Sequence, residues 1–341
     1  MTFERHFDLD GCSVAVRGRG DDLARVIDLL LGPYACAAFL SDAAIQIDID
    51  RRATPPASTE ARPRPRFSFP PLSAWESPSG GWHLVDDVAE LDVHPHAEHA
   101  RITGWLQADA PLPLVSRFAG LSVWVALMEC LRARGRYPLH GAALVSPAGE
   151  TILFSGTKGA GKSTVTLALL ERGHDVLTDD TLFLERHAAG IELIGYRKRF
   201  HVRPDLIARR PDLAPHARHP APFEPQDKLW LSLDQRFPGR TRTRAAAPTQ
   251  IYFPSIVARA TSRVVALSPR ETLLRLLADS SFVFVRPEVA PAHLACLRAL
   301  ADGARGALLE CGRDLLDDPS LYLRLLATEG EPWPSSASAS S

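Results

Sequence analysis

The sequence predicts an α/β protein whose main sheet is mixed, and three consecutive segments carry that prediction. An apolar, strand-like run at Thr151–Ser155 precedes a glycine-rich loop, and residues Ser163–Arg172 have helical periodicity that Gly173 ends. A short buried strand is expected next, at Asp175–Thr178. Two alternating runs within 181–196 are then typical of a β-hairpin. Because a hairpin joins antiparallel strands, the sheet should be mixed rather than purely parallel.

The composition fits an ordinary folded protein of about two domains. Hydrophobic residues make up 45% of the 341 residues and charged residues 23%, which excludes wholesale disorder. Lys plus Arg number 39 against 40 Asp plus Glu, so there is no overall charge favouring nucleic acid or an anionic membrane. The five cysteines are odd in number and widely spaced, which fits neither a disulfide framework nor a zinc site. Reduced thiols in a cytoplasmic protein are expected.

Neither the N-terminal residues nor the most apolar stretch predicts a membrane association. The first residues, MTFERHFDLDG, carry charges where a secretory leader needs an apolar core. The longest apolar candidate for a span, Leu121–Leu131, is short and is interrupted by Glu129. We therefore expect a cytoplasmic protein without a nucleic-acid or membrane partner, while a homo-oligomer stays open.

The N-terminal part, residues 1–105, is expected to be a smaller α+β domain. Its expected elements are strands at Cys12–Val16, Ala44–Ile49, Trp82–Val85 and Ala100–Gln107 and a helix at Asp22–Leu31. A proline-rich loop, 54–80, interrupts this domain, and the chain has 28 prolines in all. A connector is the expected role of the loop, with an SH3-type ligand as the alternative.

The larger domain is expected at 106–330, followed by a disordered tail at 331–341. It should open with a helix at Leu114–Arg134 that Gly135 ends. A second proline-rich stretch lies at 204–225. Helices are expected at Pro269–Ala278 and Ala290–Ala301, and a final strand at Gly303–Cys311.

The glycine-rich loop satisfies the Walker A pattern G-x-x-x-x-G-K-[ST] of phosphate-binding loops. Strand, glycine loop and helix N-terminus are the context that this chemistry requires, because loop N–H groups and the helix dipole then face the phosphates. Lys162 would neutralise the β- and γ-phosphates of ATP, and Ser163 would ligate Mg²⁺. A glycine-rich turn that matches by chance is the alternative. The expected nucleotide-binding residues are Gly156, Thr157, Lys158, Gly159, Ala160, Gly161, Lys162, Ser163 and Thr164.

Two acids follow the strand Asp175–Thr178. In an open α/β sheet the carboxyl ends of the strands face the ligand, so Asp179 and Asp180 are expected beside the nucleotide. One carboxylate would hold Mg²⁺ and the other could take the proton from an attacking hydroxyl. Capping of the next turn is the alternative.

His140 opens a third strand-like segment, with an apolar run at Ala142–Ser146. If this strand pairs as a hairpin with Thr151–Ser155, His140 should lie beside Gly156 at the mouth of the loop. A histidine there could orient or buffer a catalytic aspartate. The alternative is a structural histidine hydrogen-bonded to backbone.

Together these motifs resemble the HPr kinase/phosphorylase family. The residues that carry the resemblance are His140-Gly141, the loop Gly156–Ser163, Arg172-Gly173-His174 and Asp179-Asp180, within a segment of about 45 residues. The resemblance implies a mixed α/β kinase fold related to phosphoenolpyruvate carboxykinase and ATP-dependent phosphorylation of a serine hydroxyl. It also implies Asp179 as general base or acid assisted by His140, Asp180 and Ser163 as Mg²⁺ ligands, and Lys162 on the phosphates.

Two departures separate the chain from the classical members of that family. Thr164 stands where they have an acidic residue, and the later glycine-arginine-asparagine signature is absent from the sequence. Both point away from HPr as acceptor and from the reverse phosphorylase reaction. The chain is more similar to divergent HPr-kinase-related proteins of peptide natural-product pathways, including lasso peptide tailoring kinases, which phosphorylate a serine on a precursor peptide.

The sequence thus leads to three functional hypotheses. The first is an ATP/Mg²⁺-dependent kinase acting on a hydroxyl, foremost the serine of a peptide or protein; the second keeps the same site for a small-molecule hydroxyl. The third is a nucleotide-binding regulator without transfer, which would not need a base. A basic cluster could contact phosphate or an acidic substrate or could simply be solvated; it consists of Arg197, Lys198, Arg199, Arg203, Arg209 and Arg210.

Overall fold

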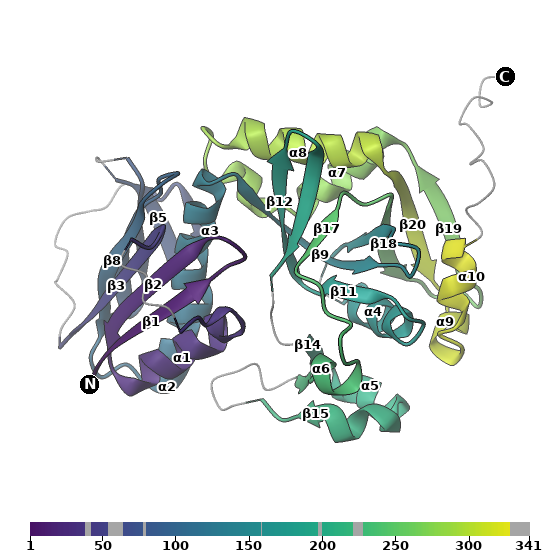
Figure 1. The fold of residues 1–341 in the computed structure, drawn as a ribbon, viewed down its shortest axis with the longest axis horizontal. Helices are drawn as coiled ribbons and strands as arrows, with labels where there is room; N and C mark the ends of the chain where they lie inside the picture. Colours follow the sequence, from purple (N-terminus) through teal and green to yellow (C-terminus); the bar gives the residue numbers. More distant parts are fainter. Residues whose placement is uncertain are drawn as a thin grey trace. The chain divides into compact units, whose positions relative to one another are not determined.

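The computed structural model describes residues 1–37, 42–53, 64–77, 80–157, 159–196, 200–220 and 228–327 (Figure 1). The chain divides into two compact units, each with its own sheet. Unit 1 comprises Met1–Pro138, Arg218–Trp230 and Phe282–His293; unit 2 comprises Leu139–Ala217, Leu231–Ser281 and Leu294–Ser341. Residues 54–63 and 78–79 of the expected proline-rich loop 54–80, the expected tail 331–341, Lys158 and residues 197–199 lie outside the described residues. The described part of 54–80 differs from the expected loop, because Phe67–Phe69 and Leu72–Glu76 form paired strands in which Leu72 and Ala74 are buried.

Unit 1 is built on an eight-stranded sheet in the order β1-β2-β3-β8-β7-β6-β5-β4. The pairs β2/β3 and β3/β8 are parallel and the other pairs are antiparallel. The strands are β1 Thr2–Asp8, β2 Ser13–Arg19, β3 Ile45–Arg52, β4 Phe67–Phe69, β5 Leu72–Glu76, β6 Trp82–Asp86, β7 Ala89–His94 and β8 Ala100–Gln107. In β3 the residues Ile45, Ile47 and Ile49 are buried while those between them are partly exposed, so one face of the sheet forms the core.

Helices cover the core face of this sheet, and several of them follow its last strand in the chain, so unit 1 extends beyond the expected boundary. They are α1 Asp21–Leu31, η1 Gly32–Tyr34, α2 Leu112–Arg117, the π-helical turn η2 Phe118–Val123 and α3 Trp124–Ala133. The expected division after residue 105 differs from the structure, where unit 1 continues to Pro138. The physical reason is burial: α3 packs on β7 and β8, and Val125, Leu127 and Leu131 are at most 3% exposed. An amphipathic pattern predicts a buried face but not which sheet it covers.

The helical stretch Leu112–Ala133 also differs from the expectation that no segment has the properties of a membrane span. By length and composition this one helix among the described residues could cross a membrane. However, 67% of its most apolar window is buried inside the protein, and the core helix of a soluble protein passes the same test. The burial accounts for its apolar composition.

Unit 2 contains the mixed sheet that the sequence predicts. Its order is β17-β13-β12-β9-β10-β18-β20-β19, and β11 pairs with β9 beside this path. The pairs β10/β18 and β18/β20 are parallel, whereas β9 is antiparallel to both β10 and β11. The strands are β9 Arg136–Val145, β10 Thr151–Ser155, β11 Asp175–Thr178, β12 Thr181–His187, β13 Gly190–Gly195, β17 Arg244–Ala246, β18 Gln250–Ile256, β19 Arg263–Leu267 and β20 Arg305–Cys311.

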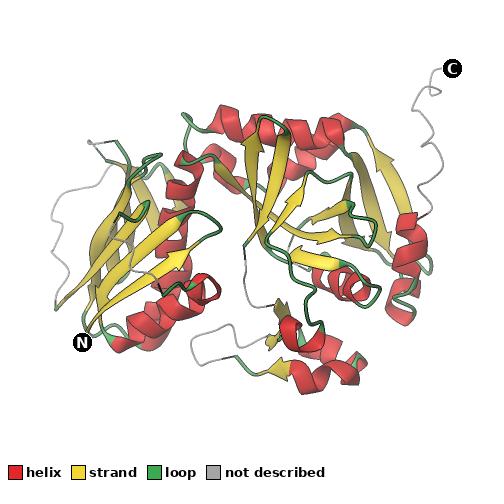
Figure 2. Cartoon of the chain, in the orientation of Figure 1, coloured by secondary structure: helices red, strands yellow, loops and turns green. Residues whose placement is uncertain are grey.

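The remaining elements are mostly helical, as Figure 2 shows by colour. Longer helices are α4 Lys162–Leu170, α7 Pro269–Ala278, α8 Ala290–Gly303 and α10 Leu321–Ala327. Short elements are β14 Phe200–Val202, α5 Pro204–Arg209, η3 Pro211–His216, β15 Ala217–Arg218, β16 Leu229–Leu231, α6 Leu233–Arg236, η4 Ser281–Phe284 and α9 Asp314–Asp317.

Several predicted elements of unit 2 are confirmed, and the predicted start of the His140 strand needs correction. The hairpin exists as β12 and β13, and α7 has the predicted bounds. His140 does not open its strand as expected but lies in the middle of β9, which begins at Arg136. Arg136, Tyr137 and Leu139 are all buried, because the strand is enclosed along its length. The start of the strand at Arg136 was not predictable from the sequence, because Pro138 and His140 interrupt the apolar pattern.

Candidate functional site

The phosphate-loop sequence forms a strand–loop–helix unit in the structure. β10 ends at Ser155, and α4 begins at Lys162 with Gly161 as its N-cap. Gly161 has φ 103° and ψ 6°, a backbone conformation that residues with a Cβ adopt only under strain. No side chain caps the first turn of α4. The positive end of the helix dipole is therefore not already engaged by an acidic cap, which suits an anion.

The side chain of Lys162 folds back onto the glycine-rich loop that is expected to bind phosphate. Lys162 is 7% exposed, and its ammonium donates hydrogen bonds to the carbonyl oxygens of Gly156 and of Thr157, the latter at 3.1 Å. A buried ammonium held at the start of a glycine loop is the point charge that phosphate binding requires.

The sheet register brings the acid pair to the same edge as this loop. In β9, Gly141 is opposite Ser155 of β10 and Ala143 is opposite Thr178 of β11. Since β10 and β11 are both antiparallel to β9, they are parallel to each other, and their carboxyl ends meet at one edge of the sheet. The Gly141 N–H donates to the carbonyl oxygen of Asp180 at 3.0 Å, which ties the residues after β11 to the strand beside the loop.

His140 lies between the loop and the acids. Its Nδ1 is 3.8 Å from Oδ1 of Asp180, and the hydroxyl of Ser155 lies 3.2 Å from its carbonyl oxygen. Burial lowers the pKa of His140, and the neighbouring Lys162 lowers it further, whereas Asp180 and Asp279 act in the opposite direction. The net pKa is below the ordinary value of histidine, which favours the neutral imidazole at neutral pH.

The oxygen-bearing residues at this edge have the chemistry of a magnesium site. Asp179 and Asp180 are half-buried, and Ser163 is half-buried in the first turn of α4. Thr181 Oγ1 donates to Oδ2 of Asp180 at 2.8 Å, which restricts that carboxylate. Carboxylate and hydroxyl oxygens are the ligands that Mg²⁺ prefers, so the donor set fits the ion.

Asp279 is a further acid at this edge that sequence reasoning missed. It follows α7, and its Oδ2 accepts a hydrogen bond from the Ser155 hydroxyl at 2.8 Å. Its carbonyl oxygen accepts from the His140 N–H at 3.2 Å. Asp279 and Ser155 are 124 residues apart, and no motif in the sequence connects them.

Two described members of the basic cluster, Arg203 and Arg210, pair with local acids. Arg203 precedes α5 and lies 3.0 Å from Asp205. Arg210 contacts both Glu171 and Asp212, the latter at 2.9 Å. Arg197 and Arg199, together with Lys158 of the loop, lie outside the described residues. The cluster is therefore at least partly a network of ion pairs.

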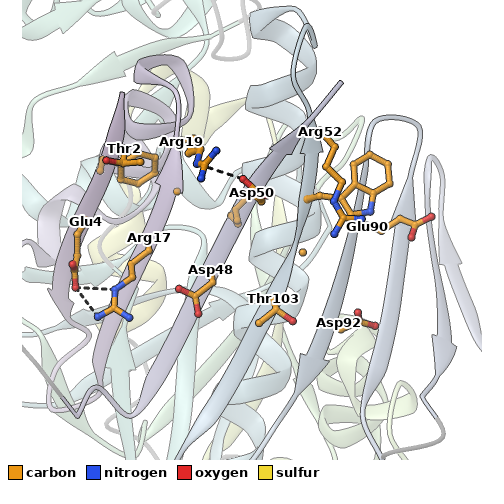
Figure 3. Close-up of a pocket in the computed structure, with 15 residues that line it drawn as sticks. Thr2, Glu4, Arg17, Arg19, Asp48, Asp50, Arg52, Glu90, Asp92 and Thr103 are labelled. Atoms are coloured by element: carbon orange, nitrogen blue, oxygen red, sulfur yellow. Dashed lines mark hydrogen bonds and ion pairs between the residues drawn. The ribbon is translucent and has the colours of Figure 1, made fainter. Parts of the chain in front are cut away.

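Other polar groupings among the described residues do not add to the site. Glu185, His187 and Glu192 come close enough to hold a metal ion, but Arg244 already pairs with both glutamates. A hollow of about 740 Å³ lies on the sheet of unit 1, where Arg17 pairs with Glu4 (Figure 3). Another, of about 620 Å³, is lined by the end of α4 and several arginines. Neither hollow is lined by the phosphate loop, His140 or the acid pair, although Arg210 of the basic cluster lines the second.

Comparisons with known proteins leave the function to be argued from this geometry. No protein-family model matches the chain, and no curated protein matches it in sequence. Among solved structures, the HPr(Ser) kinase/phosphatase from Coxiella burnetii is 12% identical, with a TM-score of 0.28. The match covers 57% of this chain and 99% of that chain. A TM-score this low carries no argument about fold or activity.

Proposed function

We propose that this chain is an ATP- and Mg²⁺-dependent phosphotransferase that moves the γ-phosphoryl group of ATP to a hydroxyl, foremost the serine of a peptide or protein. The observation that carries the proposal is the shared sheet edge. A complete phosphate loop follows β10, an acid pair follows β11, and His140 lies on the strand between them. We call the group formed by Lys162, His140, Asp179 and Asp180 the transfer edge.

The loop supplies the binding site for the phosphates. The backbone N–H groups of Gly156–Ser163 and the N-terminus of α4 would hold the β- and γ-phosphates, and Lys162 would balance their charge. Ser163 and Asp180 would hold the Mg²⁺ ion, which when bound neutralises charge on the phosphate oxygens.

The acid pair would supply the general base that takes the proton of the acceptor hydroxyl. In the transfer, the acceptor oxygen forms a bond to the γ-phosphorus while the bond between that phosphorus and the β–γ bridging oxygen breaks, and ADP leaves with the electron pair. Asp179 would accept the hydroxyl proton as general base. Neutral His140 would orient the neighbouring carboxylate of Asp180 through its ring nitrogen without adding positive charge beside Lys162.

The acceptor class follows from the family resemblance. The HPr-kinase-related pattern, without the signature associated with HPr, favours a serine on a peptide or protein, such as a ribosomal natural-product precursor. A cytoplasmic location would suit such an acceptor. A small-molecule hydroxyl would need the same site, whereas a pure nucleotide sensor would need no base, so the acid pair and His140 favour an enzyme.

The Asp179→Asn variant tests the proposal most directly. Purified wild-type protein and variant are titrated with Mg·ATP, then incubated with ATP and serine-containing precursor peptides whose mass is measured. We expect the variant to keep ATP affinity within about threefold and to lose transfer at least about a hundredfold, because general-base catalysis contributes that much. The control is Asp302→Asn, an exposed acid that pairs on α8 with Arg298 at 3.4 Å.

Each other result points to a different function. If Asp179→Asn transfers phosphate as fast as wild type, the base assignment is wrong. If wild type binds Mg·ATP and phosphorylates only small alcohols, the acceptor class is wrong. If it binds ATP and transfers to no acceptor, including water, the chain is a nucleotide-binding regulator.

A further inference from the structure

The residue after α7, Asp279, contacts both His140 of the transfer edge and Ser155, which directly precedes the phosphate loop. Oδ2 of Asp279 accepts a hydrogen bond from the Ser155 hydroxyl at 2.8 Å, and its carbonyl oxygen accepts from the His140 N–H at 3.2 Å. Ser155 is the last residue of β10 and directly precedes Gly156. One residue therefore contacts both the start of the phosphate loop and the backbone of the histidine.

The Ser155 hydroxyl is committed to this link. Ser155 is 0% exposed, so water does not compete for the proton of its hydroxyl group. The hydroxyl also lies 3.2 Å from the carbonyl oxygen of His140, but it has one proton, and the shorter contact is the one to the carboxylate. A hydrogen bond to an ionised acceptor is stronger than one between neutral groups.

Helix α7 is a firm base for that contact. Its N-terminus has a capping box, in which Ser268 and Glu271 bond each other's backbone N–H groups. Thr272 is fully buried, and α7 approaches β20 so closely that a Cβ on Gly306 would lie 1.9 Å from Thr272 Oγ1. The N-terminal part of α7 is therefore held in place independently of the phosphate loop.

A carboxylate at this position needs an explanation beyond helix capping. The C-terminal end of a helix carries partial negative charge, which disfavours an acidic side chain. The backbone N–H of Asp279 already bonds the carbonyl oxygen of Arg275, so the helix end does not require the carboxylate. The Ser155 contact is the compensating interaction, and it lies directly before the phosphate loop.

We propose that Asp279 is a positioning residue for phosphoryl transfer: through Ser155 it fixes the start of the phosphate loop, and through its carbonyl oxygen it fixes His140 beside that loop. The inference rests on the proposed function, because it assigns the loop to ATP. Asp279 does not need to touch the nucleotide. It would act by keeping the loop and His140 in one relative geometry, on which transfer rates depend steeply.

The test is a mutant cycle with Mg·ATP as substrate and water as acceptor, read as phosphate release. We expect Asp279→Ala and Ser155→Ala each to lower kcat about 10- to 100-fold while KM for ATP changes less than about threefold. The double variant should lose no more than the stronger single variant, because both remove the same hydrogen bond. Asp279→Asn keeps an acceptor oxygen and should recover most of the lost rate, while Asp302→Asn should match wild type.

Stability is followed in parallel by thermal unfolding of every variant. If Asp279→Ala does not fold, Ser155→Ala and Asp279→Asn still decide the question. Two results overturn this inference while leaving the proposed function intact. One is a double variant whose kcat falls by the product of the two single losses, and the other is a Ser155→Ala enzyme with the kcat of wild type. Where wild type transfers phosphate only to a peptide, the same cycle is read as peptide phosphorylation. A wild-type protein that does not bind Mg·ATP, or that binds it and transfers phosphate to neither peptide nor water, overturns the proposed function and this inference with it.

Discussion

Charged side chains are used in opposite ways in the two units. In unit 1, Arg132 Nη1 donates to Oε1 of Glu129 at 2.6 Å and Trp82 Nε1 donates to Oε2 of the same residue at 3.2 Å. Glu129 and Arg132 are each 1% exposed. At the transfer edge of unit 2, by contrast, the side chains of His140 and Asp180 are 38% and 41% exposed and lie 3.8 Å apart.

This difference separates charges that maintain the fold from charges that can act on a ligand. The buried pair of unit 1 is enclosed: burial raises the pKa of Glu129 more than Arg132 and Trp82 lower it. Such a group has no access to a substrate. The transfer edge leaves the side chains of His140 and Asp180 accessible beside the phosphate loop, where a ligand can reach them. We therefore expect mutations in the first region to change stability and mutations in the second to change activity.

The largest effect on stability should come from Glu129→Leu. The change leaves the Arg132 charge buried without its carboxylate partner, and breaking a buried pair in this way costs about 3–5 kcal/mol. Urea unfolding followed by circular dichroism measures the loss. The matched variant is Asp180→Asn, which alters a half-exposed acid and should change the free energy of unfolding by less than about 1 kcal/mol. Equal losses in the two variants would remove the distinction between the regions.

A smaller effect on stability is expected from the titration of His293 in unit 1. His293 is fully buried, and its ring stacks on that of Tyr137 with the ring centroids 5.1 Å apart. Burial, assisted by the charge of Arg132, lowers its pKa to about 3, while the unfolded chain has a value of about 6.5. The unfolded state thus binds a proton that the folded state does not, so this contribution to stability is complete above about pH 6.5 and falls by about 1.4 kcal/mol per pH unit below it.

His293→Phe tests this dependence because it keeps an aromatic ring and removes the titration. Unfolding free energies of wild type and variant are compared at pH 7 and pH 4.5. We expect wild type to lose about 2–3 kcal/mol more than the variant over that interval. The same loss in both proteins would show that His293 is accessible to protons in the folded state.

The smallest effect concerns backbone geometry at the phosphate loop. Gly161→Ala forces a Cβ into the left-handed conformation at φ 103° and should cost about 1–2 kcal/mol of stability. Gly120 is the control, since it lies in the helical turn η2 without a positive φ and nothing lies within 4 Å of its added Cβ. Gly120→Ala should be neutral or stabilise by up to about 1 kcal/mol. Differential scanning calorimetry distinguishes the two outcomes, and a strain-free Gly161→Ala would contradict the loop geometry.

Local pattern made much of the transfer edge predictable. The loop, its flanking strand and helix, and Asp179 and Asp180 lie within 30 residues, and a hairpin argument placed His140 beside Gly156. Long-range packing was not predictable in the same way. Asp279 reaches Ser155 across 124 residues, and nothing in an amphipathic helix indicates that α3 covers β7 and β8 of unit 1. The buried Glu129–Arg132 pair likewise reads in sequence as two ordinary charges on a helix.

The central claim is that the loop at the transfer edge binds ATP. Isothermal titration of the full chain with Mg·ATP tests it, with Lys162→Met as the matched variant, because methionine keeps an unbranched side chain of nearly the same length and removes the ammonium. We predict saturable binding with one ATP per chain in wild type and at least about tenfold weaker binding in the variant, the loss expected for one charge-assisted contact. No binding by wild type, or equal affinity in the two proteins, would contradict the account.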